Sequence, residues 1–295
     1  MALTATKALI TLGDARLLLG KGATDTADDQ LIDMIIGQAS VLIAKELGYN
    51  PIENSYKEFH AGSGDFLWLE NIPVSSVDII STDRDDVLSV IYDSTEASYA
   101  TVEVTTTALK LRKRVSGTLT TNTLVLSDYD TIADLDTAID ALTPWTCTPV
   151  SSFSTWAASS LIPMPAQHAS NSQATFSVPT TPEDDVELTP ETGCLYNWRG
   201  WSPSSGVRNV YVEYTAGWTR ADLPEPLKSA CLELVALMYN MSKKDGSLKS
   251  EELGDYEYTM ADRLGAVFSA TGGTSVSNMI AMKLGPYKRF LVRAY

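Results

Sequence analysis

The chain has 295 residues, 44% of them hydrophobic and 20% charged, which predicts a folded protein with one large or two modest domains and excludes a wholly disordered one. Asp and Glu number 37 against 22 Lys and Arg, so the formal net charge is -15. A protein that grips phosphate would be basic, and this chain should therefore repel nucleic acid over most of its surface. A protein that repels DNA can still line a channel for it, because DNA slides more easily through a channel that does not bind it.

The chain has three cysteines, Cys147, Cys194 and Cys231, which are far apart and odd in number. They form no CxxC pair and no readable disulfide framework, so we expect buried thiols made in a reducing cytoplasm. The first ten residues lack the basic stretch and long apolar run of a signal peptide. No stretch approaches the roughly eighteen apolar residues of a membrane span, and we expect no membrane insertion.

The first segment predicts a pair of helices. Thr11 is expected to cap a short helix at Leu12–Leu19, with Asp14 in the capping-box position. A second helix is expected from about Thr26, and Gly48 is expected to end it. Its apolar residues recur at three- and four-residue steps, so one face is apolar. They are Ile32, Ile35, Ile36, Ala39, Ile43 and Leu47.

The next segment changes to the alternation of β-strands. Two strands are expected to form a hairpin around the Gly-Ser-Gly of residues 62–64, and a charged turn is expected to separate two further strands. The strands are Tyr56–His60, Phe66–Glu70, Val74–Ile80 and Val87–Tyr92, and the turn is Asp83–Asp86.

From about residue 93 to 190 the chain becomes rich in Thr and Ser and is interpreted as a separate unit. Strands are expected at Thr101–Thr107, Thr118–Leu126 and Trp145–Pro149. Between them, Asp130–Leu142 predicts a helix that Thr131 caps, with Asp134 three residues on. Pro163–Pro182 is expected to be an exposed loop.

The last segment predicts a strand at Arg208–Tyr214, a turn at residues 215–218 and a long helix capped by Asp222. The apolar stripe of this helix should face the first helical pair. The stripe comprises Leu227, Ala230, Cys231, Leu234, Leu237, Met238 and Met241. Further along, Asp262–Phe268 and Asn278–Leu284 are expected to be short helices, with a linker at Ser269–Ser277 between them.

No residue pattern in the chain predicts a catalytic, cofactor or metal site. The two histidines, His60 and His168, lie in different units and in no HxxxH or HExxH pattern. The Gly-Ser-Gly turn lacks the Lys-Ser/Thr of a phosphate loop. Two acidic clusters are interpreted as solvated turns, because neither has the spaced ligands, central Gly and distal Glu of a calcium loop, and a third is explained by the electrostatics of a helix start. These clusters are Asp83, Asp85 and Asp86; Glu183, Asp184 and Asp185; and Asp25, Asp28 and Asp29.

Four tryptophans leave a carbohydrate site open as an alternative to packing. They are Trp145, Trp156, Trp198 and Trp201. Large aromatic side chains serve cores and subunit contacts well, and packing is the favoured interpretation. A short basic run is interpreted as one face of a strand or an ion-pairing site between subunits, not as a DNA clamp. It comprises Lys110, Arg112, Lys113 and Arg114.

Four stretches together resemble one family of viral proteins. They are residues 66–77 (FLWLENIPVSSV), residues 212–218 (VEYTAGW), the prolyl helix start at residues 223–228 (LPEPLK) and residues 250–258 (SEELGDYEY). In this order, after an N-terminal helical pair, they resemble the head–tail connector (adaptor) proteins of long-tailed double-stranded DNA phages. The chain departs from that family by an insert of roughly a hundred residues, about a domain's worth.

The resemblance implies an α+β fold: a helical-bundle core with a small β-layer, here with an inserted β-rich α+β lobe. Residues 1–92 and 191–295 would form the core, and residues 93–190 the lobe. It also implies a structural protein of the virion neck that forms a twelvefold ring below the portal protein. A tail or stopper protein would lie beneath, and genomic DNA would pass through without specific binding during ejection.

The C-terminal segment is expected to dock on the portal. In a chain this acidic, its basic residues stand out, and aromatic residues lie among them. The expected docking residues are Lys283, Tyr287, Lys288, Arg289, Phe290, Arg293 and Tyr295. Two alternatives stay open: a tail that packs on its own subunit, and, for the whole chain, a virion carbohydrate-binding module or glycan-active enzyme.

Overall fold

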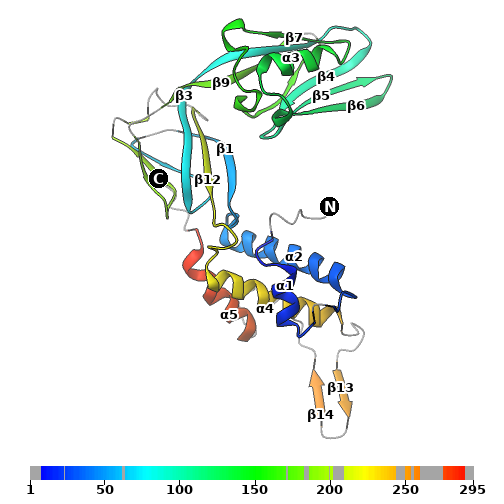
Figure 1. Ribbon diagram of the computed structural model, residues 1–295, viewed down its shortest axis with the longest axis vertical. Coiled ribbons are helices and arrows are strands. Elements are labelled where there is room, and N and C mark those ends of the chain that lie inside the picture. The colour runs from blue at the N-terminus through cyan, green and yellow to red at the C-terminus, as the bar shows by residue number, and fades with distance from the viewer. Residues whose placement is uncertain are drawn as a thin grey trace. The chain divides into compact units, whose positions relative to one another are not determined.

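In the computed structural model, the described residues are 8–22, 24–61, 64–170, 172–182, 186–198, 200–201, 209–243, 250–253, 256–259 and 275–289. The chain divides into two compact units, shown in Figure 1. The first unit comprises residues 1–54, 70–73 and 216–295, and the second comprises residues 55–69 and 74–215. Neither unit is continuous in sequence, because the chain passes back and forth between them.

The first unit is built from four helices: α1 (Leu12–Leu18), α2 (Asp29–Leu47), α4 (Glu225–Ser242) and α5 (Ser275–Leu284). The predicted caps of the first two are confirmed. Thr11 and Asp14 form a capping box at the start of α1, and Gly48 ends α2 in the left-handed conformation with φ 83°.

The helices α2 and α4 share one hydrophobic core, as the apolar patterns of their sequences predict. Ile32, Ile36 and Ile43 of α2 and Leu227 and Ala230 of α4 are each at most 1% exposed. The prediction that Asp222 caps α4 is wrong. Asp222 instead lies in a turn, where its carboxylate accepts a hydrogen bond from the Thr219 hydroxyl. The helix begins at Glu225, after Pro224.

A tight crossing of backbones joins the start of the first unit to the segment before α4. Gly217 donates its N–H to the Pro73 carbonyl at 2.8 Å, and Trp218 forms an isolated parallel bridge with Ile52. The φ of Gly217 is +104°, and a Cβ at this position would lie 2.6 Å from the backbone of Ile52 and Glu53. Only glycine fits here, which explains its place in the turn at residues 215–218.

The second unit contains two larger sheets and a small one. The five-stranded sheet has the order β1 (Asn54–His60), β12 (Val210–Ala216), β3 (Val74–Tyr92) and β7 (Trp145–Pro149), with β9 (Ala174–Pro182) also paired to β3. The three-stranded sheet has the order β10 (Val186–Thr189), β11 (Cys194–Asn197) and β2 (Phe66–Trp68).

The four-stranded antiparallel sheet has the order β6 (Thr118–Val125), β5 (Ala108–Val115), β4 (Ala97–Val104) and β8 (Met164–His168). The core beneath it also takes in the helix α3 (Ile132–Asp140) and the strands β7 and β9. Thr131 and Asp134 cap α3 as predicted. The same core includes Val87, Leu88, Val90 and Tyr92 from the second half of β3, and we name the elements that share this core the lobe.

Four single 3-10 turns and one small hairpin complete the described structure. The turns are Leu126–Asp128, Ser151–Phe153, Ala158–Ser160 and Gly285–Tyr287. The hairpin pairs β13 (Ser250–Leu253) with β14 (Tyr256–Thr259) in the first unit. No helix among the described residues is long and apolar enough to cross a membrane.

The expected fold class, a helical-bundle core with a small β-layer, is wrong. The protein mixes α and β structure, but it is mostly antiparallel β-sheet, and its described residues form only five α-helices. Two misread segments account for much of the difference. Asp83–Asp86 is no turn but the bulged middle of the 19-residue strand β3, and Pro163–Pro182 is no loop but contains β8 and β9.

Tertiary pairing overrides the local signals in both segments. Phe176 and Val178 are fully buried where β9 pairs with β3, and Ser177 donates its hydroxyl to Asp86 at 2.7 Å. The expected hairpin of residues 56–70 is also wrong, because β1 pairs with β12 and β2 pairs with β11. The predicted helix at Asp262–Phe268 lies outside the described residues, whereas α5 confirms the helix expected at Asn278–Leu284.

Candidate interaction surfaces of the helical unit

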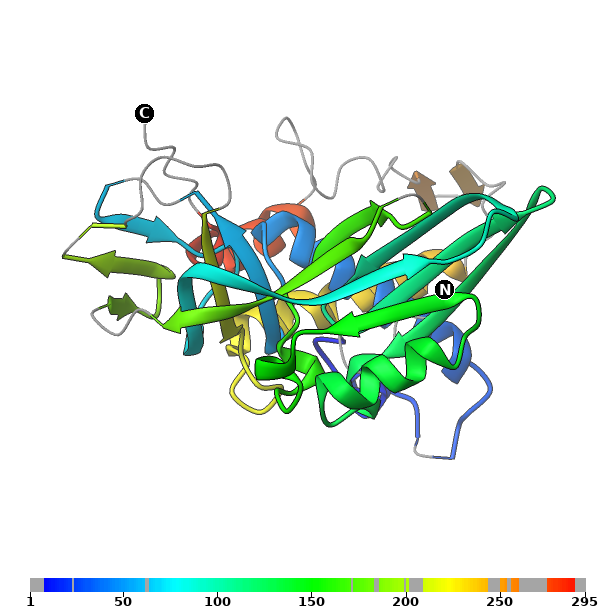
Figure 2. The ribbon, with the colours of Figure 1, turned by 90° about the horizontal axis from the view of Figure 1, so that it is seen from above.

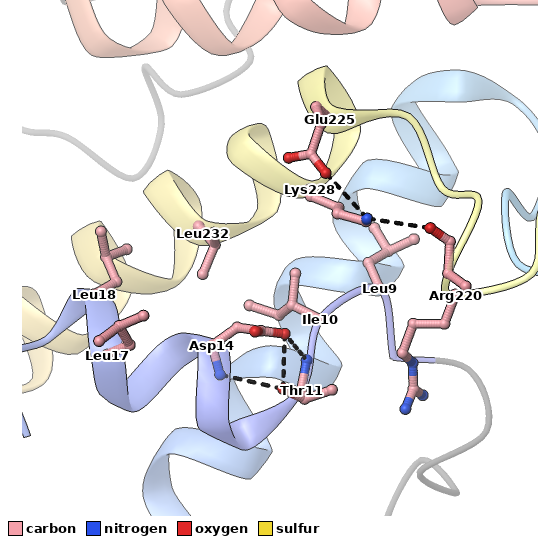
Figure 3. Close-up of a pocket in the computed structure, with 11 residues that line it drawn as sticks. Leu9, Ile10, Thr11, Asp14, Leu17, Leu18, Arg220, Glu225, Lys228 and Leu232 are labelled. Carbon is pink, nitrogen blue, oxygen red and sulfur yellow. Dashed lines mark hydrogen bonds and ion pairs between the residues drawn. The ribbon is translucent and has the colours of Figure 1, made fainter. Parts of the chain in front are cut away.

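An open groove lies between the start of the chain and the first half of α4, and Figure 3 shows its lining. Its volume is about 820 Å³. The floor is apolar: Leu9 and Ile10 are buried there, and Leu232 faces them from α4. Leu17 and Leu18, at the end of α1, form one side of the groove and are 82% and 49% exposed. Leucines this exposed are unusual beside a concave surface, and they leave apolar area open to a partner.

Charged side chains line the rim of this groove and form hydrogen bonds and an ion pair there. Asp14 accepts hydrogen bonds from the Thr11 hydroxyl at 2.7 Å and from the Thr11 N–H at 3.0 Å. These bonds lower the pKa of Asp14, and the charges of Lys228 and Arg220 lower it further. Lys228 forms an ion pair with Glu225 at 3.1 Å. The rim is therefore charged at neutral pH, and its composition is that of a polar border around an apolar centre.

A second apolar surface lies on α5. Ile280 and Leu284 are fully buried against α2 and α4, whereas Met279 and Met282 are 52% and 77% exposed. The two methionines are three residues apart and therefore neighbours on the outer face of the helix. Methionine is flexible and adapts its shape to a partner, which suits it to interfaces.

The two apolar surfaces lie on opposite sides of the helical unit. The helices α1 and α5 each contact both α2 and α4. Figures 1 and 2 show α1 and α5 on opposite sides of the α2–α4 pair. We name the groove with Leu17 and Leu18 the α1 surface, and the face with Met279 and Met282 the α5 surface.

An ionic cluster joins the turn before α2 to the end of α4. The Asp28 carboxylate accepts hydrogen bonds from Lys243 at 2.7 Å and from the Tyr239 hydroxyl at 2.5 Å, and it pairs with Lys21 at 2.8 Å. Lys21, then Lys243 and Tyr239, hold the pKa of Asp28 well below its usual range, and the same contacts raise the pKa of both lysines.

The predicted docking residues that are described lie against their own unit. Lys283 forms an ion pair with Glu233 and a 2.6 Å hydrogen bond to Ser229. Lys288 pairs with Glu46 of α2. Phe290, Arg293 and Tyr295 lie outside the described residues.

Two more of these residues are bound by aromatic and backbone contacts. The Tyr287 ring meets Trp218 edge-on at 6.0 Å, and the Tyr287 carbonyl accepts a hydrogen bond from the Tyr49 hydroxyl at 2.9 Å. Arg289 donates to the Glu70 carbonyl at 2.7 Å and, through its N–H, to the Leu47 carbonyl at 3.1 Å. The segment as far as Arg289 is therefore anchored on the helical unit.

Other residues weighed as sites have structural partners. The His60 ring lies 3.2 Å from the Glu58 carboxylate, and His168 packs edge-on against Tyr99. Arg112 of the basic run pairs with Glu103, and Lys113 lies over the Tyr92 ring. The described residues contain no group of three or more acidic, histidine or cysteine side chains placed to hold a metal ion.

The tryptophans and cysteines follow the packing interpretation in part. Trp145 and Trp201 are buried, whereas Trp156 and Trp198 are 38% and 64% exposed. All three cysteines are buried free thiols, and burial raises the pKa of each, that of Cys231 to about 12. Thiols with raised pKa values are poor nucleophiles at neutral pH.

No known family model matches the chain, and no curated protein matches it. Two solved structures contain similar chains. One is described as the neck of an empty GTA particle computed with C6 symmetry; it is 14% identical, with a TM-score of 0.39 over 100% of this chain and 97% of that one. The other, from the virion of a native gene transfer agent (GTA) particle, is 14% identical, with a TM-score of 0.42 over 100% of this chain and 96% of that one.

The sequence did not single out the α1 and α5 surfaces. Leu17, Leu18, Met279 and Met282 belong to apolar patterns that predict helices, but a pattern does not tell which apolar residues stay uncovered. The sequence of α1 did contain a sign of an uncovered surface. Its apolar residues extend beyond the one face of the helix that α2 and α4 cover.

Proposed function

We propose that this protein is a non-enzymatic structural subunit of a phage neck, a head–tail connector that assembles into a ring below the portal. The ring, which the resemblance implies to be twelvefold, joins the capsid to the tail or a stopper and lines the passage of the genome. The two similar solved chains come from a neck and a virion particle. The proposal rests on the connector-like segments of the sequence and on the two apolar surfaces of the helical unit.

The observation that carries the ring is the pair of unlike apolar surfaces on opposite sides of one unit. A contact between two different surfaces is head-to-tail, so each copy offers one surface to each neighbour, and such contacts close into rings. In the proposed ring, the α5 surface of one copy contacts the α1 surface of the next. Met279 and Met282 would cover the apolar floor of the groove, and the charged rim would disfavour other orientations of the neighbouring copy.

The acidic composition fits the proposed channel. With a net charge of -15, the ring would repel phosphate and let DNA pass without binding it. Docking on the portal is assigned to the C-terminal segment from Lys283 to Tyr295. Residues as far as Arg289 are anchored on the helical unit, so this part of the segment would fix the place at which the segment meets the portal.

A mixing experiment tests the ring. The Leu17→Gln, Leu18→Gln variant damages the α1 surface, and the Met279→Gln, Met282→Gln variant damages the α5 surface. Met34→Gln is the matched control, since Met34 is 53% exposed on α2, outside both surfaces. Assembly would be followed by light scattering and by imaging, with and without the portal.

The wild type and the Met34→Gln control should assemble into rings. Each double variant alone should form no ring. An equimolar mixture of the two should gain one contact between an α1 surface and an α5 surface per pair and still close no ring, because only one intact contact is possible. Normal rings from either double variant would contradict the proposed contact. A wild type that forms no ring alone or on its portal would contradict the proposed function.

A further inference from the structure

The strand β6 is an unprotected sheet edge. Its eight residues, Thr118–Val125, contain no charged residue and no proline, and six of them are exposed. Within the described part of the chain, β6 pairs with β5 on one side and with no strand on the other. Figure 1 shows it at the rim of the four-stranded sheet. A long uncharged edge with free N–H and C=O groups is a template for another strand.

The outer strands of the other sheets of this unit carry the features that discourage such pairing. The strand β1 contains Lys57 and Glu58, β7 ends in Pro149, β10 contains Glu187, and β2 has only three residues. Among the strands described, β6 is the one edge strand that is long and contains neither a charged residue nor a proline.

The opposite edge of the same sheet is closed. The strand β8 contains Pro165, and its Gln167 side chain bonds to the backbone of Thr175 in β9, donating at 3.0 Å and accepting at 3.3 Å. The sheet is therefore sealed at β8 and open at β6. A second copy cannot offer β8, so among its sheet edges β6 itself is the available partner.

The side chains of β6 are arranged symmetrically about Asn122. The pairing with β5 places Leu119, Thr121 and Thr123 on the outer face, opposite Arg114, Arg112 and Lys110. Val125, two residues further on, shares this face. Leu119 and Val125 are 51% and 41% exposed, and each lies three residues from Asn122.

We propose that β6 pairs antiparallel with β6 of a second copy, about a two-fold axis at Asn122. This register places Leu119 of each copy opposite Val125 of the other and Thr121 opposite Thr123, so apolar and threonine pairs form across the junction. Opposite residues then share a face of the sheet in both copies. The two four-stranded sheets join into one.

The proposed contact is separate from the proposed ring. A two-fold contact is isologous and has no place inside a ring of purely cyclic symmetry. It would join free subunits before they enter a ring, or copies that belong to different assemblies. It uses only the four-stranded sheet and does not depend on the α1 or α5 surface.

Cross-linking tests the register, in the Leu17→Gln, Leu18→Gln background so that rings do not form. Leu119→Cys and Val125→Cys variants would be treated with a short thiol cross-linker, separately and mixed. The native thiols are at most 7% exposed and give little background. The mixture should form covalent dimers, whereas Leu119→Cys alone should not, because its two copies would lie about 20 Å apart.

Light scattering tests the association itself. The background protein should be a dimer at tens of micromolar concentration, the Thr121→Lys, Thr123→Lys variant should be a monomer, and Thr106→Lys, in the exposed β4–β5 turn, should remain a dimer. A monomeric background protein would overturn the proposal. A background protein that stays monomeric but binds an extended segment of another protein along β6 would overturn it as well. So would equal cross-linking of Leu119→Cys alone and in the mixture.

Discussion

Gly217 shows how a single residue connects sequence and fold. The stretch around it predicted a turn, and the structure supplies the reason for the glycine: a φ of +104° and a crossing backbone 2.6 Å from where a Cβ would lie. The sequence could predict the turn because the composition of turns is local. It could not predict the crossing, because Ile52 and Glu53 are distant in sequence.

The variant Gly217→Ala should destabilise the protein by about 2–4 kcal/mol, since alanine is strained at this φ and its methyl group would clash with rigid backbone. Gly285→Ala is the control, because no atom lies within 4 Å of a Cβ there, and it should change stability by less than about 0.5 kcal/mol. Chemical denaturation would measure both. Equal stability of the two variants would contradict the crossing.

Asp28 should give the helical unit an acid-sensitive contribution. Because its pKa is lowered in the folded protein, the stabilisation is present above the ordinary carboxylate pKa near 3.8 and is lost as the pH falls through the folded value. The Asp28→Asn variant should therefore melt at a lower temperature than wild type at pH 7. The difference should shrink below about pH 4.

Melting temperatures across the pH range would test this prediction. Asp33→Asn, on the exposed side of α2, is the control, and its melting temperature should follow that of the wild type. A constant difference between Asp28→Asn and wild type from pH 7 to pH 2 would show that the charge of Asp28 does not contribute.

At the scale of elements, caps and amphipathic helices were predictable, and long-range strand pairing was not. The Thr and Asp of both capping boxes lie three residues apart, so the signal is contained in one turn of helix. The strand β3 contains four consecutive charged residues, Asp83–Asp86, which have the composition of a turn, and only the pairing with β9 shows that the strand continues through them. Pairings between distant segments leave little local trace.

The packing of α2 on α4 makes Ile36 sensitive to charge. Ile36→Asp should lower the free energy of unfolding by about 4 kcal/mol or more, because Ile36 is 1% exposed and an unpaired charge would be buried. Val41→Asp is the control on the same helix, since Val41 is 47% exposed, and it should have a small effect. A cooperative melt unchanged in Ile36→Asp would rule out this packing.

The lobe gives a prediction about excision. Replacing residues 93–190 by a short linker should fail to give a folded protein, because Val87, Leu88, Val90 and Tyr92 would lose the core they share with the lobe. Replacing residues 84–180 should succeed, because Asp83 and Thr181 are paired neighbours on β3 and β9, and a short Gly/Ser turn can join them. Circular dichroism and thermal melting would compare the two variants. If the replacement of residues 93–190 folded and that of residues 84–180 did not, the end of β3 would be needed by the part of the protein outside the lobe.

At the scale of the whole molecule, the sequence indicated a structural protein with a basic C-terminal docking segment, but not the surfaces left open by folding. Leu17 and Met282 became candidates only after the packing of α2 and α4 showed which apolar residues remain uncovered. Burial depends on all elements together, so exposed apolar area cannot be found from one segment. The open edge of β6 depends in the same way on the absence of a pairing strand among the described residues.

Truncation after Arg289 tests docking on the portal. This variant keeps the anchoring contacts of Tyr287, Lys288 and Arg289 and removes only residues 290–295. It should melt like the wild type and bind the portal at least tenfold more weakly in a pull-down or by interferometry. Truncation after Leu284 should also lower the melting temperature, because it removes the anchors. Undiminished portal binding after truncation at Arg289 would reject these six residues as a docking element.

The interleaving of the two units along the chain also sets an order of events during synthesis. The lobe core from Val87 to Val178 is contiguous and can close as soon as that stretch leaves the ribosome. The helix α2 is made early but must wait for α4, far downstream, before its apolar face is covered. At about 5–20 residues per second, that wait is on the order of ten to forty seconds. For that interval the nascent chain carries a folded sheet lobe and an uncovered helix, which is a natural binding target for a chaperone.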